Sequence, residues 1–383
     1  MSEFRWDPIA ARWTILAPDR TRRPNDYADS EPALPAHRIC PFCAGNEGET
    51  PPEVYAERES GSANGEGWAV RVVSNKFPAL EREGLTSPSG RGSCEVRSGG
   101  GDDEVVQSMP AVGAHEVSEA RSGGGDELIQ SMLGVGVHEV IIENPAHDHR
   151  LTDAPLDTFL RLSRAVRFRM EALAEDSRLR SIQVFKNSGA EAGATLVHGH
   201  SQLIALPFVP PRLAEKCAAF DSHRQQSGGC LFCDLLDEER RRGDRIIFET
   251  EEFVALSPHA ARMPYESWLV PKRHQARFDQ ADGSQMAGFA AALRDLLARL
   301  GACLNHPPYN FWIHTAPLHS GEGERGGEES SPPSAGCFHW HLEIMPRMSK
   351  LAGFEWATGL HINSVSPEKA CVALREAGRE GPK

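Results

Sequence analysis

The sequence contains no apolar run that approaches the ~18 residues needed for a membrane-spanning helix. Its first residues show no basic patch followed by an apolar stretch, so we expect a cytoplasmic protein without a secretory signal. Basic residues are in the minority, with 41 Lys and Arg against 54 Asp and Glu and a net charge of −13. Non-specific nucleic-acid binding needs a basic surface, so this balance argues against it. An anionic substrate remains possible through a local basic cluster.

A disulfide framework is not expected either. The nine cysteines are an odd number in a chain with no export signal. Four of them form two close pairs with CxxC spacing, Cys40 with Cys43 and Cys230 with Cys233. In a reducing compartment this spacing indicates metal binding or redox chemistry. Neither pair opens a helix directly after a strand, as a thioredoxin-like motif does, so we favour metal binding and keep redox chemistry as the alternative.

The chain length and the pattern of apolar residues indicate two similar units. The 383 residues are enough for about two domains of ordinary size. Each half contains one CxxC, Val- and Ile-rich strand patterns, one long amphipathic helix and a closing strand that starts with His-x-His. Helices are expected at 155–176 and 283–302, and strands at 67–75, 136–144, 181–186, 200–206, 245–256 (a hairpin), 267–271, 309–315 and 339–346. We interpret 1–207 and 208–383 as duplicated α+β units.

Two stretches interrupt this pattern. Residues 97–117 are echoed by 121–140 in a near-tandem, glycine-rich copy. Two copies are too few to bury the core of a solenoid, so we interpret 83–134 as an insertion with one copy extruded as a loop. Residues 319–336 are polar, acidic and of low complexity, which predicts a flexible surface loop.

The segment from Asn187 to Gln202 carries the strongest chemical signal. A glycine-rich turn is followed by a strand in which His198, His200 and Gln202 alternate. Alternate side chains of a strand share one face at ~6.5–7 Å per step, so we expect all three to point into one site. Backbone N–H groups in the glycine-rich turn can approach an anion such as a phosphate. The alternative is a polar strand face in solvent, which the coincidence of these features disfavours.

Each CxxC pair needs two further ligands to complete a tetrahedral zinc site. The candidate sets contain two cysteines and two histidines each, namely Cys40, Cys43, His147 and His198 for the first site, and Cys230, Cys233, His274 and His339 for the second. His341 is an alternative to His339. Because two cysteines and two histidines close the zinc coordination shell, we expect about two structural zinc ions per chain.

The segment 187–202 resembles the active-site signature of the galactose-1-phosphate uridylyltransferase branch of the histidine-triad superfamily. The matching residues are Asn187, Gly193, Thr195, His198, His200 and Gln202. Further blocks of the family pattern occur in order along the chain, at 5–8, 13–24, 40–43, 74–80, 307–310, 338–341 and 353–355. The resemblance covers nearly the whole chain except roughly 83–134 and 319–336, and agreement at so many separated blocks makes it specific.

The resemblance implies an α+β fold of two tandem histidine-triad-like units, each a mainly antiparallel sheet with a long helix. It also implies a ping-pong nucleotidyl transfer in which His200 is the nucleophile and His198 its zinc-binding neighbour. Imidazole is a good nucleophile toward phosphorus, and the resulting phosphoramidate can pass the group on. Gln202 can donate a hydrogen bond to the phosphoryl oxygens without titrating, which favours transfer over hydrolysis. By the same resemblance, the Gly199 carbonyl is expected to orient the other imidazole nitrogen of His200.

Further substrate contacts are implied by the resemblance. The matches to nucleotide and α-phosphate contacts are Asn75, Phe185, Asn187, Gly193, Thr195 and Gln202. Arg20 and Arg23 match basic residues near the phosphates, although such a pair alone is more often a solvated charge run. Phe354 and Glu355 match a segment that binds sugar hydroxyls from the partner subunit in dimeric family members. A homodimer is therefore expected, while Phe354 taken alone would be read as a core residue.

The expected function is hexose-1-phosphate nucleotidylyl transfer, converting UDP-glucose and galactose 1-phosphate into glucose 1-phosphate and UDP-galactose. Two features differ from the best-known enterobacterial pattern: Gly199 stands in place of a proline, and a second CxxC is present. This pattern is similar to the subgroup that includes ADP-glucose phosphorylase, so adenylyl transfer through the same histidine is the alternative. A nucleotide-binding zinc protein without turnover is the non-enzyme alternative, which the intact His-x-His-x-Gln disfavours.

Overall fold

The structure, a computed structural model, describes residues 3–7, 12–16, 39–82, 131–147, 149–318 and 337–379. The strands of its large sheet are β3 (Glu53–Arg58), β4 (Trp68–Ser74), β6 (Val137–Ile142), β7 (Ser181–Ser188), β8 (His200–Leu206), β9 (Ile246–Glu249), β10 (Phe253–Leu256), β11 (Ser267–Pro271), β12 (Tyr309–His314) and β13 (His341–Pro346). A small sheet joins β1 (Glu3–Asp7), β2 (Arg12–Leu16) and β5 (Ser131–Leu133). The α-helices are α1 (Leu156–Ala174), α2 (Pro211–Ser227), α3 (Leu231–Arg242), α4 (Gly283–Leu304), α5 (Gly353–Thr358) and α6 (Pro367–Arg379). Single turns of 3-10 helix are η2 (Glu47–Glu49), η5 (Leu151–Asp153), η6 (Ala190–Ala192) and η7 (Phe278–Gln280).

The large sheet has the strand order β3-β4-β6-β8-β7-β12-β13-β11-β10-β9, with all neighbours antiparallel. Its centre is the β7–β12 pair, in which Asn187 lies opposite Asn310. Outward from β7 the strands are β8, β6, β4 and β3, and outward from β12 they are β13, β11, β10 and β9. Each side therefore has the same topology, with β8 and β13 in equivalent positions. The expected α+β class with a mainly antiparallel sheet is confirmed.

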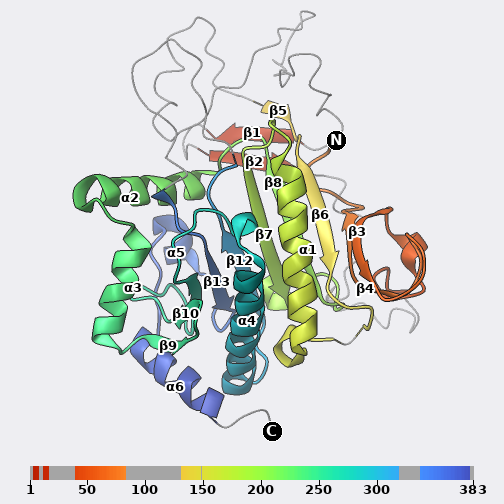
Figure 1. Ribbon diagram of the computed structural model, residues 1–383. Helices are drawn as coiled ribbons and strands as arrows, with labels where there is room; N and C mark the ends of the chain where they lie inside the picture. Colours follow the sequence, from red (N-terminus) through yellow and green to blue (C-terminus); the bar gives the residue numbers. More distant parts are fainter. Residues whose placement is uncertain are drawn as a thin grey trace, which may run out of the picture.

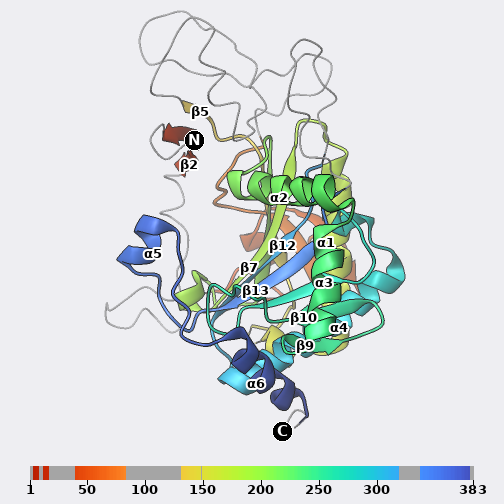
Figure 2. The same cartoon turned by 90° about the vertical axis from the view of Figure 1, so that its left-hand side faces the viewer.

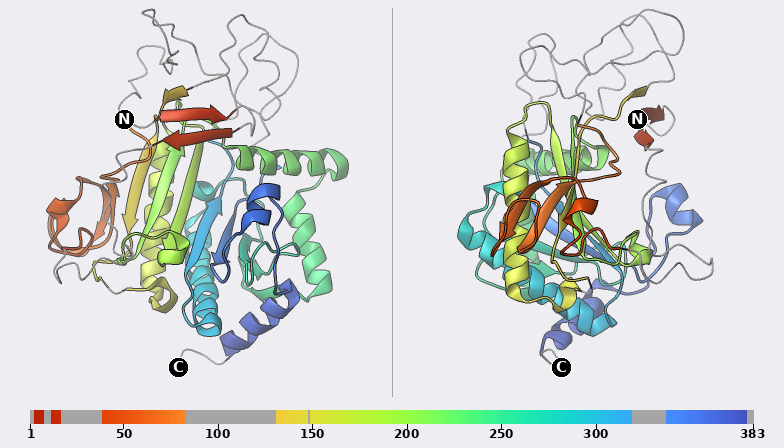
Figure 3. Two further views of the ribbon diagram at one scale, coloured as in Figure 1. Left: turned by 180° about the vertical axis from the view of Figure 1, so that it is seen from behind. Right: turned by 90° about the vertical axis from the view of Figure 1, so that its right-hand side faces the viewer.

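Helices α1 and α4 lie side by side on one face of the sheet (Figure 1). Both turn an apolar stripe toward the strands, and the buried Phe159 of α1 and Phe289 of α4 belong to one hydrophobic core that spans both halves. Alternation in β8 sends Leu203 and Ala205 into this core. His200 and Gln202 therefore point to the opposite face, where α5 also lies (Figures 2 and 3).

The expected strands and the two long helices are all present. Period-two and helical patterns predict them well because each has one face in a large apolar core. Helices α2, α3, α5 and α6 were not predicted. Helix α2 buries only Cys217 and Phe220, so its apolar pattern is weak. No helix in the described ranges is long and apolar enough to cross a membrane.

Some sequence predictions fall outside the described residues. These are Arg20, Arg23, the loop at 319–336 and the insertion at 83–134 apart from its last four residues. Within the described ranges, residues 131–133 form β5 and pair with β1.

Candidate active site

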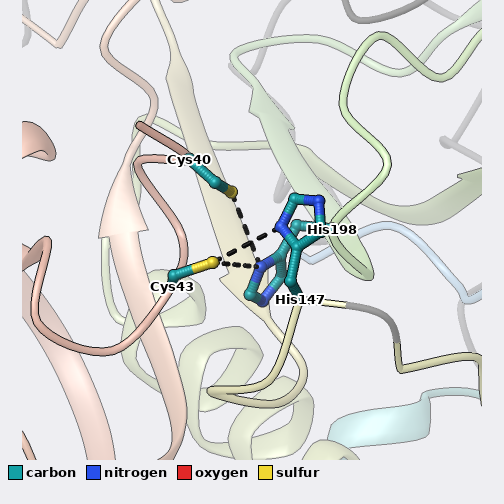
Figure 4. Close-up of side chains that lie close together, drawn as sticks. All are labelled: Cys40, Cys43, His147 and His198. Atoms are coloured by element: carbon teal, nitrogen blue, oxygen red, sulfur yellow. Dashed lines mark hydrogen bonds between the residues drawn. The ribbon is translucent and has the colours of Figure 1, made fainter. Parts of the chain in front are cut away.

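Four predicted metal ligands meet beside the start of β8 (Figure 4). The Sγ atom of Cys40 lies 3.6 Å from His198 Nδ1, and Cys43 Sγ lies 3.4 Å from His147 Nδ1 and 3.6 Å from His198 Nδ1. All four ligand atoms are within 4.8 Å of one another. Zn–S and Zn–N bonds of ~2.3 and ~2.0 Å in a tetrahedron place S and N about 3.5 Å apart. The donor set and its spacing therefore fit zinc.

The surroundings of this cluster fix its donor atoms. His198 Nε2 donates to the Asn144 carbonyl at 2.7 Å, so the lone pair on Nδ1 faces the sulfur atoms. Burial raises the pKa of the Cys40 thiol to about 11. The thiol is therefore protonated at neutral pH unless a cation stabilises the thiolate, and zinc binding would release that proton.

A second cluster of the same kind joins the other CxxC pair to His274 and His339. His339 Nδ1 lies 3.5 Å from Cys230 Sγ and 3.7 Å from Cys233 Sγ. His339 Nε2 donates to the Pro271 carbonyl at 2.9 Å, which repeats the orientation of His198. Of the two histidines left open by the sequence, the structure places His339 beside the cysteines. Cys230 precedes helix α3, which follows helix α2 rather than a strand, so the thioredoxin-like pattern is absent here.

His200 is the buried first residue of β8. Its Nδ1 lies 2.9 Å from the His198 carbonyl, not the Gly199 carbonyl that we expected. The Gly199 carbonyl instead accepts the N–H of Glu143 at 3.2 Å. Burial lowers the pKa of His200 to about 4, so its ring is neutral at pH 7. With Nδ1–H donating to the carbonyl, Nε2 keeps the lone pair that a nucleophile requires.

Gln202 lies two residues further on the same face of β8. Its Oε1 is 3.0 Å from Nε2 of His138 in β6, and Asn75 Nδ2 is 3.1 Å from the same nitrogen. Phe185 lies opposite Gln202 in the β7–β8 register. The predicted residues Phe185 and Gln202 therefore lie side by side on β7 and β8, and Asn75, directly after β4, reaches the same group through His138. His198, by contrast, precedes β8 and turns to the cysteines, so only His200 and Gln202 share the strand face.

The glycine-rich turn after β7 is held against β12. Asn310 Nδ2 donates to Asn187 Oδ1 at 2.7 Å and to the Ala192 carbonyl at 2.8 Å. Gly189 and Gly193 have φ values of +86° and +84°, a region that favours glycine. A Cβ at Gly189 would also lie 2.9 Å from the Pro308 side chain. The turn is thus fixed by its backbone, with the half-buried Thr195 just beyond it.

Phe354 and Glu355 lie on α5, at a distance from this group. The Phe354 side chain is 50% exposed, and Glu355 accepts the N–H of Ala352 at the start of its own helix. Within the described ranges, no hydrogen bond or ring contact joins either residue to His200 or Gln202. The interpretation of Phe354 as a core residue of this chain is therefore wrong.

A buried ion pair between Lys186 and Glu143 was not predicted from the sequence. Lys186 Nζ donates to both Glu143 oxygens at 2.9 and 2.8 Å and to the His200 carbonyl at 3.2 Å. Ser201 Oγ donates to Glu143 at 2.6 Å. A Cβ at Gly199 would lie 3.1 Å from the His149 carbonyl oxygen and 3.2 Å from Glu143 Oε2, so a larger residue between the histidines would require these neighbours to shift. The signal in the sequence is limited to one charged residue within β7, Lys186, and one directly after β6, Glu143.

A third cluster in β12 and β13 mirrors the His200 site. His341 Nδ1 lies 3.0 Å from the His339 carbonyl, as His200 does from His198. The ring of Phe232 packs on His341 with centroids 4.5 Å apart, and Phe42 packs on His200 at 5.3 Å. His314, His341 and Glu343 could offer ligands to a metal, but Lys216 Nζ lies 3.1 Å from His341 Nε2 and is paired with Glu343. Here the nitrogen equivalent to His200 Nε2 is already in contact with the Lys216 ammonium.

The chain is similar to known proteins along nearly its whole length. Residues 110–210 match the model of the N-terminal domain of galactose-1-phosphate uridyl transferase, and residues 216–351 match that of its C-terminal domain. ADP-glucose phosphorylase of Arabidopsis thaliana is 32% identical over 376 residues, covering 98% of this chain and 92% of that protein. Galactose-1-phosphate uridylyltransferase of Thermotoga maritima is 26% identical and covers 98% of each.

Solved structures agree with these matches. The crystal structure of the Arabidopsis thaliana ADP-glucose phosphorylase with bound ADP-glucose has a TM-score of 0.66 at 31% identity, and covers 98% of this chain and 99% of that chain. A uridylyltransferase structure has a TM-score of 0.71 at 23% identity and covers 100% of both chains, which supports the fold. Proteins of this kind act on nucleotide sugars and hexose 1-phosphates. From the matched domains and the near-complete coverage, the chain belongs to the galactose-1-phosphate uridylyltransferase family and is an enzyme of the nucleotidyltransferase type.

Proposed function

We propose that the chain transfers UMP from UDP-glucose to galactose 1-phosphate through a covalent intermediate on His200. The observation that carries the proposal is the buried, neutral imidazole with Nδ1 held by the His198 carbonyl at 2.9 Å. In the first step Nε2 attacks the α-phosphorus, and the bond to the departing glucose 1-phosphate breaks. In the second step a phosphate oxygen of galactose 1-phosphate attacks the same phosphorus, and the P–N bond breaks. The carbonyl stabilises the positive charge that the ring carries in between.

The residues around His200 are proposed to bind and orient the nucleotide. The amides of Asn75, Asn187 and Gln202 supply hydrogen-bond donors, and the turn at Gly193 and Thr195 supplies backbone N–H groups for an anion. Phe185 offers an apolar surface beside Gln202. Arg20 and Arg23 remain proposed phosphate ligands. Transfer of this kind relies mainly on positioning and on stabilising charge at the phosphoryl oxygens.

Zinc is proposed at the two Cys and His clusters. Cys40, Cys43, His147 and His198 would hold one ion, and Cys230, Cys233, His274 and His339 would hold the other. When bound, zinc supplies cross-links between distant segments of the chain. The first site would fix the backbone at His198, whose carbonyl holds His200.

Adenylyl transfer from ADP-glucose is the second candidate, because the relative at 32% identity over 98% of this chain is an ADP-glucose phosphorylase. A single experiment tests both. Wild-type protein is incubated with UDP-glucose or ADP-glucose labelled with ³²P at the α-phosphorus and quenched in alkali, which preserves a phosphoramidate. We expect one donor to label the protein, with UDP-glucose favoured. The same donor labelled at the β-phosphorus is the control and leaves no label, because that phosphorus departs with glucose 1-phosphate. Absence of labelling by both α-labelled donors refutes the proposal.

The proposed homodimer is supported by an exposed apolar stretch on the open face of the sheet. Phe354, Trp356, Leu360 and Ile362 are 50–75% exposed within one short segment. In the proposed dimer this segment covers the partner's active site and brings Phe354 and Glu355 to its sugar.

The dimer prediction concerns Trp356→Glu combined with Leu360→Glu. Placing two carboxylates in an apolar interface is expected to give monomers by light scattering and to lower kcat/KM at least ~10-fold, since interface anchors carry much of the binding energy. Val372→Glu changes a comparably exposed apolar residue on α6 and serves as the control, with mass and activity unchanged. A monomeric wild-type protein with full activity contradicts the prediction.

The division into histidine-triad-like units at 1–207 and 208–383 is kept as a proposal. Its support is the equivalent strand order on the two sides of the β7–β12 pair. The cytoplasmic location also stays a prediction.

A further inference from the structure

Gln202 is in contact with a buried histidine that has no role in the function proposed above. His138 lies in β6, diagonal to Gln202 across the β6–β8 pair, and both side chains are buried. His138 Nε2 is 3.0 Å from Gln202 Oε1, and His138 Nδ1 receives the backbone N–H of Ala79 at 3.0 Å. Both ring nitrogens of His138 are therefore engaged.

These contacts determine the tautomer of His138. A backbone N–H can only donate, so Nδ1 must be the unprotonated nitrogen that accepts from Ala79. In the neutral ring the proton then resides on Nε2, which can only donate. Its partner atom on Gln202 must be the carbonyl oxygen, as placed, because the other group beside Nε2 is the Asn75 NH₂ and the proton would otherwise have no acceptor. The Gln202 amide is therefore held in one orientation, with its NH₂ group directed away from His138.

Asn75 is oriented in a related way. Its Oδ1 accepts the N–H of Phe77 at 2.9 Å, so its NH₂ is the group beside His138 Nε2. The Asn75 NH₂ and the His138 Nε2–H are both donors and cannot bond each other, so the Asn75 amide hydrogens are available to a third partner. Asn75 and Gln202 thus present two NH₂ groups on either side of one imidazole.

In the other half of the sheet, two glutamates occupy the positions equivalent to His138 and Gln202. Gln202 lies opposite Val140, two residues after His138, and Glu343 lies opposite Trp268, two residues after Glu266. Arg262 bonds both Glu266 and Glu343. The same two positions are thus linked in both halves, by a neutral pair beside His200 and by a charged network beside His341. The neutral pair leaves the amide of Gln202 free to meet a phosphate.

We propose that His138 is a positioning residue, which holds the Gln202 amide so that its NH₂ donates to the oxygens of the transferred phosphoryl group. This inference rests on the proposed function, in which the α-phosphorus is attacked by His200. Without His138, Gln202 can rotate and present its carbonyl oxygen, which repels a phosphoryl oxygen. The residue then acts on the rate of transfer more than on binding of the nucleotide sugar.

The test is a double-mutant cycle on the single-turnover rate of His200 labelling. His138→Ala is expected to slow labelling roughly 10- to 100-fold, somewhat less than deletion of an oxyanion donor, with KM changed less than about threefold. In a Gln202→Ala background the same substitution is expected to change the rate less than about twofold, because the group it orients is gone. His138→Gln, which restores an N–H donor near the Nε2 position, is expected to recover part of the rate. Circular dichroism and thermal melting confirm that each variant is folded.

Two results overturn the inference. One is labelling of folded His138→Ala at the wild-type rate, and the other is equal, additive losses in both backgrounds. If His138→Ala does not fold, His138→Gln and its cycle with Gln202→Ala decide. Failure of the proposed function looks different, because then the wild-type protein itself takes no label from either donor.

Discussion

The substitution His200→Asn is expected to abolish covalent labelling and to lower kcat by on the order of 10³-fold or more, as loss of a nucleophile does. The amide of His200→Asn can still donate to the His198 carbonyl, which holds Nδ1 at 2.9 Å in the wild-type protein. It has no lone pair equivalent to Nε2. The substitution thus removes the nucleophile and retains the local hydrogen bond. The measurement is alkali-stable ³²P on the protein together with steady-state turnover of the preferred donor.

The chain contains its own matched control for this result. His341 is buried, has Nδ1 3.0 Å from the His339 carbonyl and packs on Phe232, so it reproduces the setting of His200. Its Nε2 faces the Lys216 ammonium at 3.1 Å. His341→Asn is therefore expected to take label at the wild-type level per folded molecule. Equal loss in the two variants, or normal labelling of His200→Asn, contradicts the assignment of the nucleophile.

Much of the fold could be predicted from local sequence patterns. Strand β8 was predicted at 200–206 and β11 at 267–271, as observed, because alternating or continuous apolar residues mark strands in a large core. Helix α2 was missed because it lies mostly in solvent and buries only two side chains. The equivalent order of strands on either side of β7 and β12 depends on long-range pairing, which spacing does not encode.

The candidate site was likewise predicted only in part from the sequence. The CxxC pairs could be matched to histidines because zinc requires four ligands of known type, and Cys40, Cys43, His147 and His198 do meet. The prediction that the Gly199 carbonyl orients His200 was wrong, because the His198 carbonyl is the one that lies 2.9 Å from Nδ1. The partnership of His138 with Gln202 depends on the β6–β8 register. Such contacts follow from which strands are neighbours, and no single segment of the sequence contains that information.

The second large effect is expected on removal of a zinc ligand. We predict that freshly purified, reduced protein contains two zinc ions per chain by elemental analysis. Structural zinc binding has apparent free energies of ~10–16 kcal/mol in small domains, so loss of one ion is expected to cost several kcal/mol of unfolding free energy. Cys40→Ser and Cys230→Ser should each reduce the zinc content to about one ion and lower Tm. One ion or none in the wild-type protein contradicts the second site.

The two variants should differ in activity, which separates the roles of the sites. The first cluster includes His198, whose carbonyl accepts Nδ1–H of His200, the proposed nucleophile, at 2.9 Å. The second cluster includes His339, whose carbonyl holds His341 instead. Cys40→Ser is therefore expected to lower the labelling rate per folded molecule at least ~10-fold, in line with changes around a metal ligand. Cys230→Ser is expected to keep that rate within about twofold. If both variants lose the same labelling rate at matched folded fractions, zinc acts on the whole fold. A local effect on His200 requires a larger loss in Cys40→Ser than in Cys230→Ser.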